Sequence, residues 1–436
     1  MENNKITIYT FIIYIIDIVS LIIGIFLLVS GKFPESCFLP FIFAITSIVT
    51  DRNIGTFWTS PLRYIIYFIF GLKFVLVPLF YTLYPIEIFS RVERYSTNAI
   101  ILQIIEYFSV LTGYLIVKKI HVVGQFSYNG NDFHLRTNGV IFVTCIVLIY
   151  IFIIIRHPSF LAYFSFLDFS KSEYLMTDFH GPEYQIFAFI SITLYLAVPL
   201  IITLALHKIN KWYSSFLIMI VGFLPFVIST VNHWYSFVIW ATIIIFLFRY
   251  RPNSRAMIFL AFIVGIIVIP PLIESKVNNT ISLGFSVSSY VCGFLHVAPV
   301  FLMSKTNKLA VSVSDLLHST PFVMGLISIK TPISSDIYNW TMFGYERYDQ
   351  FIPMSAQLFY YIGSFFPVAY IFFMRFLTGV EDVVKTTRSP LLSIFATEYL
   401  IIFAYIVCTG NLNSFITTCF DFVFVYLLYK FGVSRS

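Results

Sequence analysis

The sequence has few charged residues for its length, which excludes most soluble folds. Only 11% of its 436 residues are Asp, Glu, Lys or Arg, whereas soluble domains carry about 25%. Hydrophobic residues make up 59% and aromatic residues 19% of the chain, and the mean hydropathy is +0.88. This composition excludes an ordinary soluble enzyme and a disordered chain, and it predicts an all-α, polytopic membrane protein.

Cysteine pairs and the motifs of soluble enzymes are also lacking. The five cysteines are odd in number and have no CxxC spacing, so no disulfide framework and no metal site is predicted. No GxxxxGK[ST], HExxH, GxSxG or Asp-x-Asp pattern occurs, which argues against a metal-dependent nucleotide-sugar transferase. The Lys and Arg residues are scattered between apolar blocks, so the formal net charge of +6 does not indicate a nucleic-acid partner.

Long apolar segments are what the sequence does contain. A helix needs about 20 apolar residues to cross a bilayer, and about twelve segments qualify as transmembrane helices, two of them short. They lie near 6–29, 37–50, 64–84, 98–117, 140–155, 185–206, 213–230, 235–249, 256–273, 357–377, 391–408 and 412–429. The first is too long for the apolar core of a signal peptide, so it is expected to remain as a helix.

Loop charge and loop length predict the topology. Placing the N-terminus inside puts most basic residues of the short loops in the cytoplasm, so both termini are predicted to be cytoplasmic. The chain then divides into a nine-helix bundle (1–273), a large periplasmic loop between helices 9 and 10 (274–356) and a three-helix C-terminal segment (357–436). Residues 284–303 are apolar, but a span there would invert every later loop. A helix lying against the outer leaflet is preferred.

Five charged residues fall inside predicted spans, each at a cost of about 2.5–3.5 kcal/mol if unpaired. They are Asp17, Lys73, Glu106, Glu398 and Asp421. One interpretation is an ion relay. The preferred interpretation is structural, with Lys73 paired to an acid such as Glu106 and the other carboxyls hydrogen-bonded.

Two polar stretches stand out against this apolar background. They are Asp315-Leu-Leu-His-Ser-Thr-Pro321 and Phe351-Ile-Pro-Met-Ser-Ala-Gln-Leu-Phe-Tyr-Tyr-Ile-Gly363. Together with the twelve-helix hydropathy, the outer loop at 156–184 and the paired helices at 213–249, they resemble bacterial O-antigen polymerases (the Wzy class). This class belongs to the wider group of oligosaccharide repeat-unit polymerases and O-antigen ligases. Many of these proteins have a Ser-Gly-Ser-Arg-like turn between the paired helices, where this chain has Ser229-Thr-Val-Asn-His233.

The resemblance implies glycosyl transfer at the periplasmic face of the bacterial inner membrane. A glycan on undecaprenyl pyrophosphate would be moved to an incoming lipid-linked repeat unit, without a metal or other cofactor. Membrane lipids and a chain-length regulator protein are the further partners that the resemblance implies. A lipid-linked oligosaccharide flippase or transporter, and an O-antigen ligase, remain as alternatives.

Such a reaction needs cations for the pyrophosphates and a base for the acceptor hydroxyl. Residues predicted to bind pyrophosphate are Arg156, His157, Arg347, Lys276 and His233. The first choice for the base is His318, with Glu346, Asp349 and His296 as alternatives. Each also has a structural interpretation, as a lipid head-group contact, a loop ion pair or an interfacial histidine. Arg91 and Arg94 are predicted to contact head groups.

Overall fold

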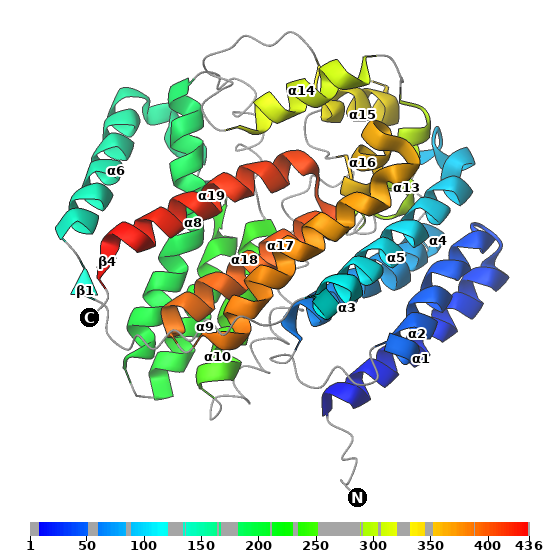
Figure 1. Ribbon diagram of the computed structural model, residues 1–436, viewed down its shortest axis with the longest axis horizontal. Coiled ribbons are helices and arrows are strands. Elements are labelled where there is room, and N and C mark those ends of the chain that lie inside the picture. The colour runs from blue at the N-terminus through cyan, green and yellow to red at the C-terminus, as the bar shows by residue number, and fades with distance from the viewer. Residues whose placement is uncertain are drawn as a thin grey trace, which may run out of the picture.

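Long apolar helices dominate the computed structural model (Figure 1). The structure describes residues 8–50, 60–83, 89–120, 134–135, 137–163, 165–166, 182–209, 212–229, 234–251, 288, 291–303, 307–320, 332–344, 352–387 and 389–434. The helices of the first half are α1 (Ile8–Ser30), α2 (Phe38–Thr50), α3 (Pro61–Gly71), α4 (Val77–Leu83), α5 (Ser96–Ile120), α6 (Thr137–Arg156), α8 (Pro182–His207), α9 (Trp212–Val227) and α10 (Trp234–Tyr250). Those of the second half are α13 (Phe294–Val297), α14 (Lys308–Ser319), α15 (Ser334–Phe343), α16 (Met354–Ile362), α17 (Phe366–Thr386), α18 (Pro390–Thr409) and α19 (Leu412–Gly432).

Six of the described helical segments are long and apolar enough to cross a membrane. They are Phe11–Ser30, Pro61–Leu83, Glu93–Lys118, Ile186–His207, Met354–Thr386 and Pro390–Thr409. Shorter apolar helices cover Pro34–Thr50, Thr144–Arg156, Tyr213–Phe226, Tyr235–Tyr250 and Leu412–Val425. The protein therefore has the architecture of a multi-pass helical membrane protein. Of the twelve predicted spans, only 256–273 lies outside the described residues.

The predicted span 357–377 is divided in the structure. Helix α16 ends at Gly363, whose φ of +59° lies in the left-handed region that glycine adopts without steric cost. A short 3-10 turn, η9 (Gly363–Phe365), follows, and α17 then runs to Thr386. Pro367 stands in the first turn of α17, where its missing N–H would have no helical partner in any case. Hydropathy alone merged the two helices because both are apolar.

The described part of the segment 284–303, residues 288 and 291–303, does not form the surface helix that the sequence predicted. Among its described residues, α13 and the following turn η8 (Ala298–Phe301) are packed inside the bundle against α5, and Phe294 and Val297 are fully buried. Gly293 permits this packing, since a Cβ there would lie 2.8 Å from the hydroxyl of Tyr81. A helix against lipid would instead expose an apolar face.

Helix α14 has the exposed apolar face that the sequence analysis expected earlier in the loop. Leu309, Val313 and Leu316 are 78%, 47% and 53% exposed and follow one another at helical spacing. Asp315 and Val311 lie on the opposite face and are buried. This division is typical of a helix at a membrane interface.

Two short ladders join distant loops. Strand β1 (His134–Leu135) pairs with β4 (Val433–Ser434), and β2 (Ser165–Phe166) pairs with β3 (Ile228–Ser229), both antiparallel. In the topology predicted from loop charge, β1 and β4 belong to cytoplasmic segments, β2 belongs to the outer loop 156–184, and β3 lies at the outer end of the predicted span 213–230. Both ladders are compatible with that topology.

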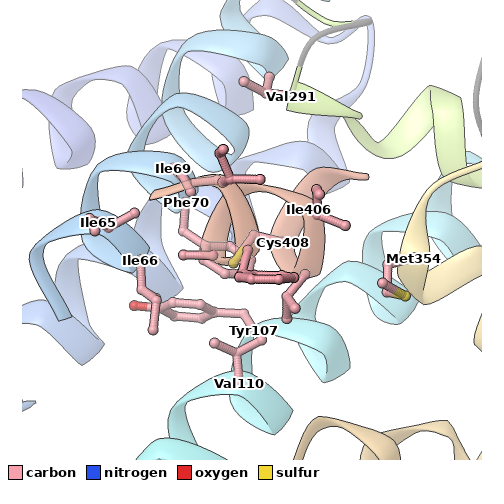
Figure 2. Packing of buried hydrophobic residues seen from close by; sticks show 14 of the residues in the cluster. Ile65, Ile66, Ile69, Phe70, Tyr107, Val110, Val291, Met354, Ile406 and Cys408 are labelled. Atoms are coloured by element: carbon pink, nitrogen blue, oxygen red, sulfur yellow. The ribbon is translucent and has the colours of Figure 1, made fainter. Parts of the chain in front are cut away.

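Aromatic and aliphatic side chains fill the centre of the bundle (Figure 2). The ring of Tyr107 on α5 lies between Phe70 and Phe74, with centroids 4.7 and 5.2 Å away. Ile406 and Cys408 of α18 belong to the same cluster. This packing joins the first five helices to the C-terminal ones, so the predicted division at 357 does not separate two cores.

Candidate functional site

A network of buried polar side chains joins the two stretches that the sequence analysis singled out. The Asp315 carboxylate on α14 accepts hydrogen bonds from the Ser334 backbone N–H at 3.0 Å, from Gln357 Nε2 at 3.2 Å and from Asn413 Nδ2 at 3.1 Å. Asp315 is 2% exposed, and Ser334 and Gln357 are fully buried. A buried carboxylate requires such donors, because an unsatisfied one is costly. The network thus fixes α14, α15, α16 and α19 relative to one another.

Gln357 is the central member of this network. Its Oε1 accepts the Leu412 backbone N–H at 2.7 Å, which supplies a partner for an orphan donor in the first turn of α19. Its Nε2 lies 3.0 Å from both Ser334 Oγ and Asn413 Oδ1. We define the Asp315 network as Asp315, Ser334, Gln357 and Asn413. It lies where Figure 1 shows α14, α15 and α16 gathered at one end of the bundle.

His318 stands one turn beyond Asp315 on α14 and is half-buried. Its Nδ1 lies 2.8 Å from the carbonyl oxygen of Ser314. A carbonyl only accepts, so this bond places a hydrogen on Nδ1, and in the neutral ring with that hydrogen Nε2 is the acceptor. In that tautomer His318 has a lone pair that can take a proton from a hydroxyl group.

His296, the alternative base, is placed differently. It lies on α13, is 1% exposed, and its Nδ1 is 3.0 Å from the hydroxyl of Tyr81. The hydroxyl of Tyr338 donates to its backbone carbonyl at 2.8 Å. Burial lowers the pKa of His296 to about 3, so the ring stays neutral at physiological pH. No substrate hydroxyl can reach this position without opening the core.

Arg156 and His157 end α6 as predicted, and both are paired with an acid that the sequence analysis did not consider. Arg156 Nη1 lies 2.8 Å from Glu183 Oε1, and His157 Nε2 contacts Glu183 Oε2. Arg156 is 59% and Glu183 38% exposed at the side chain. No hydrogen bond or ion pair among the described residues joins this cluster to His318. Figure 1 shows α6 running from β1 toward the end of the bundle that holds α14.

The remaining predicted site residues lie outside the described residues. They are Glu346, Arg347, Asp349, Lys276 and His233. Gly344, two residues before Glu346, ends α15 with φ +78°. A Cβ at Gly344 would lie 2.8 Å from Cζ of Arg91, so the Arg91 guanidinium packs on this turn. Arg91 was predicted as a head-group contact, and its packing on the Gly344 turn was not anticipated.

Three of the charged residues predicted inside the membrane, Asp17, Lys73 and Glu106, are buried and hydrogen-bonded. Glu398 and Asp421 are also buried, and each has one carboxylate oxygen without a hydrogen-bond partner among the described residues. Lys73 Nζ lies 2.7 Å from Glu106 Oε2, both side chains are fully buried, and Lys73 also donates to the carbonyl of Cys408 at 2.9 Å. The predicted pairing of Lys73 with Glu106 is therefore confirmed. Lys73 lies in the π-helical turn η3 (Leu72–Leu76) between α3 and α4. Asp17 accepts from Ser47 and from Tyr67, each at 3.1 Å.

An apolar groove of about 320 Å³ lies between α5 and α17. Phe108 and Ile105 line it from α5, and Val368 and Ile371 line it from the first half of α17. Val368 is 51% exposed, so the groove faces the region that lipid would occupy. Helix α16, which carries Gln357, packs against both α5 and α17.

The sequence predicted the positions of the polar site residues but not the residues that they contact. Asp315 and Gln357 were inside the quoted stretches, but Asn413 and Glu183 were not considered. The available signal was polarity in an apolar chain. Asn413 stands in the first turn of α19, two residues after Asn411, and Glu183 stands in the first turn of α8. A group of three His, Cys, Asp or Glu residues that could hold a metal is absent from the described part of the chain.

Comparison of the chain with protein-family models, with curated proteins and with solved structures gives no match.

Proposed function

We propose that this protein transfers a glycan from one lipid pyrophosphate to another lipid-linked saccharide at the end of the bundle formed by α14, α15 and α16. His318 carries the proposal. It is half-buried, its Nδ1 bonds to the carbonyl oxygen of Ser314, and it stands one turn from Asp315 on α14, at the end of the bundle where α14, α15 and α16 gather. It supplies the base that an acceptor hydroxyl needs, and the apolar groove between α5 and α17 is the candidate for a prenyl chain.

The proposed step balances with this residue alone as the acid–base group. The bond between the anomeric carbon of the donor glycan and its pyrophosphate oxygen breaks, and the pyrophosphate leaves with the electron pair. The acceptor hydroxyl oxygen bonds to the same carbon, and its proton passes to Nε2 of His318. Leaving-group charge requires cations, for which Arg156 and Arg347 remain the candidates because a guanidinium binds two phosphate oxygens at once.

Within this proposal the polymerase is preferred over the ligase and the flippase because of the resemblance of its loop stretches. Deletion of the gene in its host distinguishes the three. A polymerase null displays single repeat units on lipid A core, a ligase null accumulates lipid-linked polymer, and a flippase null traps units in the cytoplasmic leaflet.

His318→Ala then tests the site. Loss of a general base lowers the rate by about 10²- to 10⁴-fold, so polymer should disappear while protein level stays normal. Ser312→Ala, on the same helix, is the matched control and should retain polymer. Full-length polymer from His318→Ala at normal expression would refute the assignment of the base.

The proposed site must also face the periplasm. Reporter fusions after residue 310 should behave as periplasmic, and fusions after residue 385 as cytoplasmic. The ladder between β2 and β3 is compatible with this arrangement, because β2 lies in the predicted outer loop 156–184 and β3 at the outer end of the predicted span 213–230. Fusions 310 and 385 reporting the same side would contradict it.

A further inference from the structure

Two carboxyl groups in the C-terminal helices are buried without the hydrogen bonds that the sequence predicted for them. Glu398 lies near the middle of α18 and Asp421 near the middle of α19, and they are 1% and 3% exposed. Oε1 of Glu398 and Oδ1 of Asp421 are enclosed and have no hydrogen-bond partner among the described residues. An enclosed polar atom without a partner is uncommon in a native protein, and it indicates a functional role or a bound water or ion at that atom.

The two carboxyl groups belong to one junction of three helices. The rings of Tyr399 on α18 and Phe422 on α19 pack together, with centroids 5.0 Å apart. These rings directly follow Glu398 and Asp421 in the sequence, so both carboxyl groups lie beside one helix contact. Tyr235 on α10 interacts electrostatically with both of them, as Tyr399 does. Helices α10, α18 and α19 therefore meet around this pair.

A third enclosed oxygen without a partner lies on α10. Thr242 is fully buried, and its Oγ1 has no hydrogen-bond partner within the described part of the chain. It stands seven residues after Tyr235 and seven before Arg249, whose Nη1 donates to Ser393 Oγ on α18 at 3.0 Å. Residues seven apart share one face of a helix, so Thr242 lies on the face of α10 that packs on α18. The unpartnered oxygens at this junction thus come from all three helices.

The junction offers no basic side chain that would compensate a carboxylate. The titratable groups that interact with Glu398 and Asp421 are Tyr235 and Tyr399, whose hydroxyl groups are uncharged. The other helices packed on α18 or α19 are α3, α6, α8, α14, α16 and α17, and their described residues provide no Lys, Arg or His that interacts with either carboxyl group. A buried carboxylate without a counter-charge is so costly that the group becomes neutral. A proton needs one oxygen for this, whereas Mg²⁺ or Ca²⁺ takes about six or more.

We propose that Glu398 and Asp421 form a proton-binding site within the membrane, where each carboxyl group holds one proton in the folded protein and releases it as the pH rises. A protonated carboxyl group gains an O–H donor, which a neighbouring oxygen such as that of Thr242 can accept. Release leaves a charge among apolar helices, so it should weaken the packing of α10, α18 and α19. The site is independent of the proposed glycosyl transfer.

Infrared spectra of the purified full-length protein test the site directly, because a protonated carboxyl group and a carboxylate have separate stretching bands. Wild type should show protonated-carboxyl bands at neutral pH that weaken as the pH rises. Glu398→Gln and Asp421→Asn should each remove part of this signal. Glu35→Gln, which changes an exposed acid in the turn before α2, is the matched control and should leave the signal unchanged. A neutral-pH signal that neither Glu398→Gln nor Asp421→Asn reduces would overturn the proposal.

The pH dependence of stability tests the consequence of proton release. The folded state binds more protons than the unfolded state, so the ratio of folded to unfolded protein should fall as the pH rises, by up to about tenfold per pH unit for each carboxyl group. The double variant Glu398→Gln/Asp421→Asn keeps the shape of the neutral groups, so it should lose this part of the pH dependence. Identical pH profiles of the double variant and wild type would contradict the proposal. If the double variant does not fold, the infrared titration of wild type decides the question.

Sodium separates a proton site from a cation site. Infrared spectra recorded in sodium chloride and in choline chloride, at the same pH and ionic strength, should superimpose, because the site takes protons alone. Loss of the protonated-carboxyl signal on adding sodium would assign the junction to a monovalent cation and refute the proton.

Discussion

Two polar regions of the molecule use the same residue types but differ in whether solvent reaches them. Around α13 and the Lys73–Glu106 pair, polar groups are bonded to one another inside the core, and His296 is 1% exposed. At α14 and α16 the Asp315 network is buried, and His318, one turn beyond Asp315, is half-buried. A fully buried polar group affects stability and the choice of packing, whereas a partly exposed one can also meet a substrate.

The largest expected change in the free energy of unfolding lies at the buried Lys73–Glu106 pair. Glu106→Ala leaves the Lys73 ammonium buried without its carboxylate, which should lower the free energy of unfolding by about 3–5 kcal/mol. Thermal unfolding of the purified protein measures this. The double variant Lys73→Met/Glu106→Leu should recover most of the loss, because apolar residues of similar volume carry no desolvation cost. A Glu106→Ala protein as stable as wild type would show that water reaches the pair.

Acid should lower stability through the buried ring of His296. Its pKa falls from 6.5 to about 3 on folding, so the folded state binds fewer protons between these values. The contribution to stability is therefore present above pH 6.5 and is lost as the pH drops below it, by at most about 1.4 kcal/mol per pH unit. Unfolding free energies of wild type and His296→Phe across this range should diverge in slope. Superimposable pH profiles would contradict the burial of the ring.

The Asp315 network should respond less strongly, because it lies nearer the surface. Gln357→Leu removes the acceptor for the Leu412 N–H and a donor to Asp315, at an expected cost of about 1–3 kcal/mol. Unfolding in denaturant measures the change. Ser312→Ala, on the outer part of α14, should stay within about 0.5 kcal/mol of wild type. Equal stability of the two variants would mean that the network does not fix these helices.

The smallest change in the free energy of unfolding is expected at the exposed cluster of Arg156, His157 and Glu183. Glu183→Ala removes the carboxylate shared by Arg156 and His157, and exposed pairs of this kind contribute about 0–1 kcal/mol. Thermal unfolding at low and high salt should show a small difference that salt reduces further. A loss of stability larger than that of Gln357→Leu would show that this cluster is shielded from solvent like the buried pairs.

The separation of α16 from α17 shows a limit of predicting helices from hydropathy alone. Positions 357–377 are predominantly apolar, which predicts one span, yet the 3-10 turn Gly363–Phe365 separates α16 from α17. Glycine and proline three to four residues apart were the available signal, but both also occur inside membrane helices, so they did not decide the matter. The interfacial helix was misplaced for a related reason: 284–303 is more apolar than α14, although α14 is the helix with one exposed apolar face.

What the sequence determined by itself was the helical, multi-pass architecture, most helix positions and the pairing of Lys73 with Glu106. These follow from the bilayer, which demands long apolar helices and a partner for any charge within them. The tertiary structure decided which polar groups meet: Asp315 with Gln357 and Asn413, Arg156 with Glu183, and His296 inside the core while His318 stays half-buried. Such pairings join residues tens to hundreds of positions apart, and they depend on how helices pack, which no local pattern of hydropathy records.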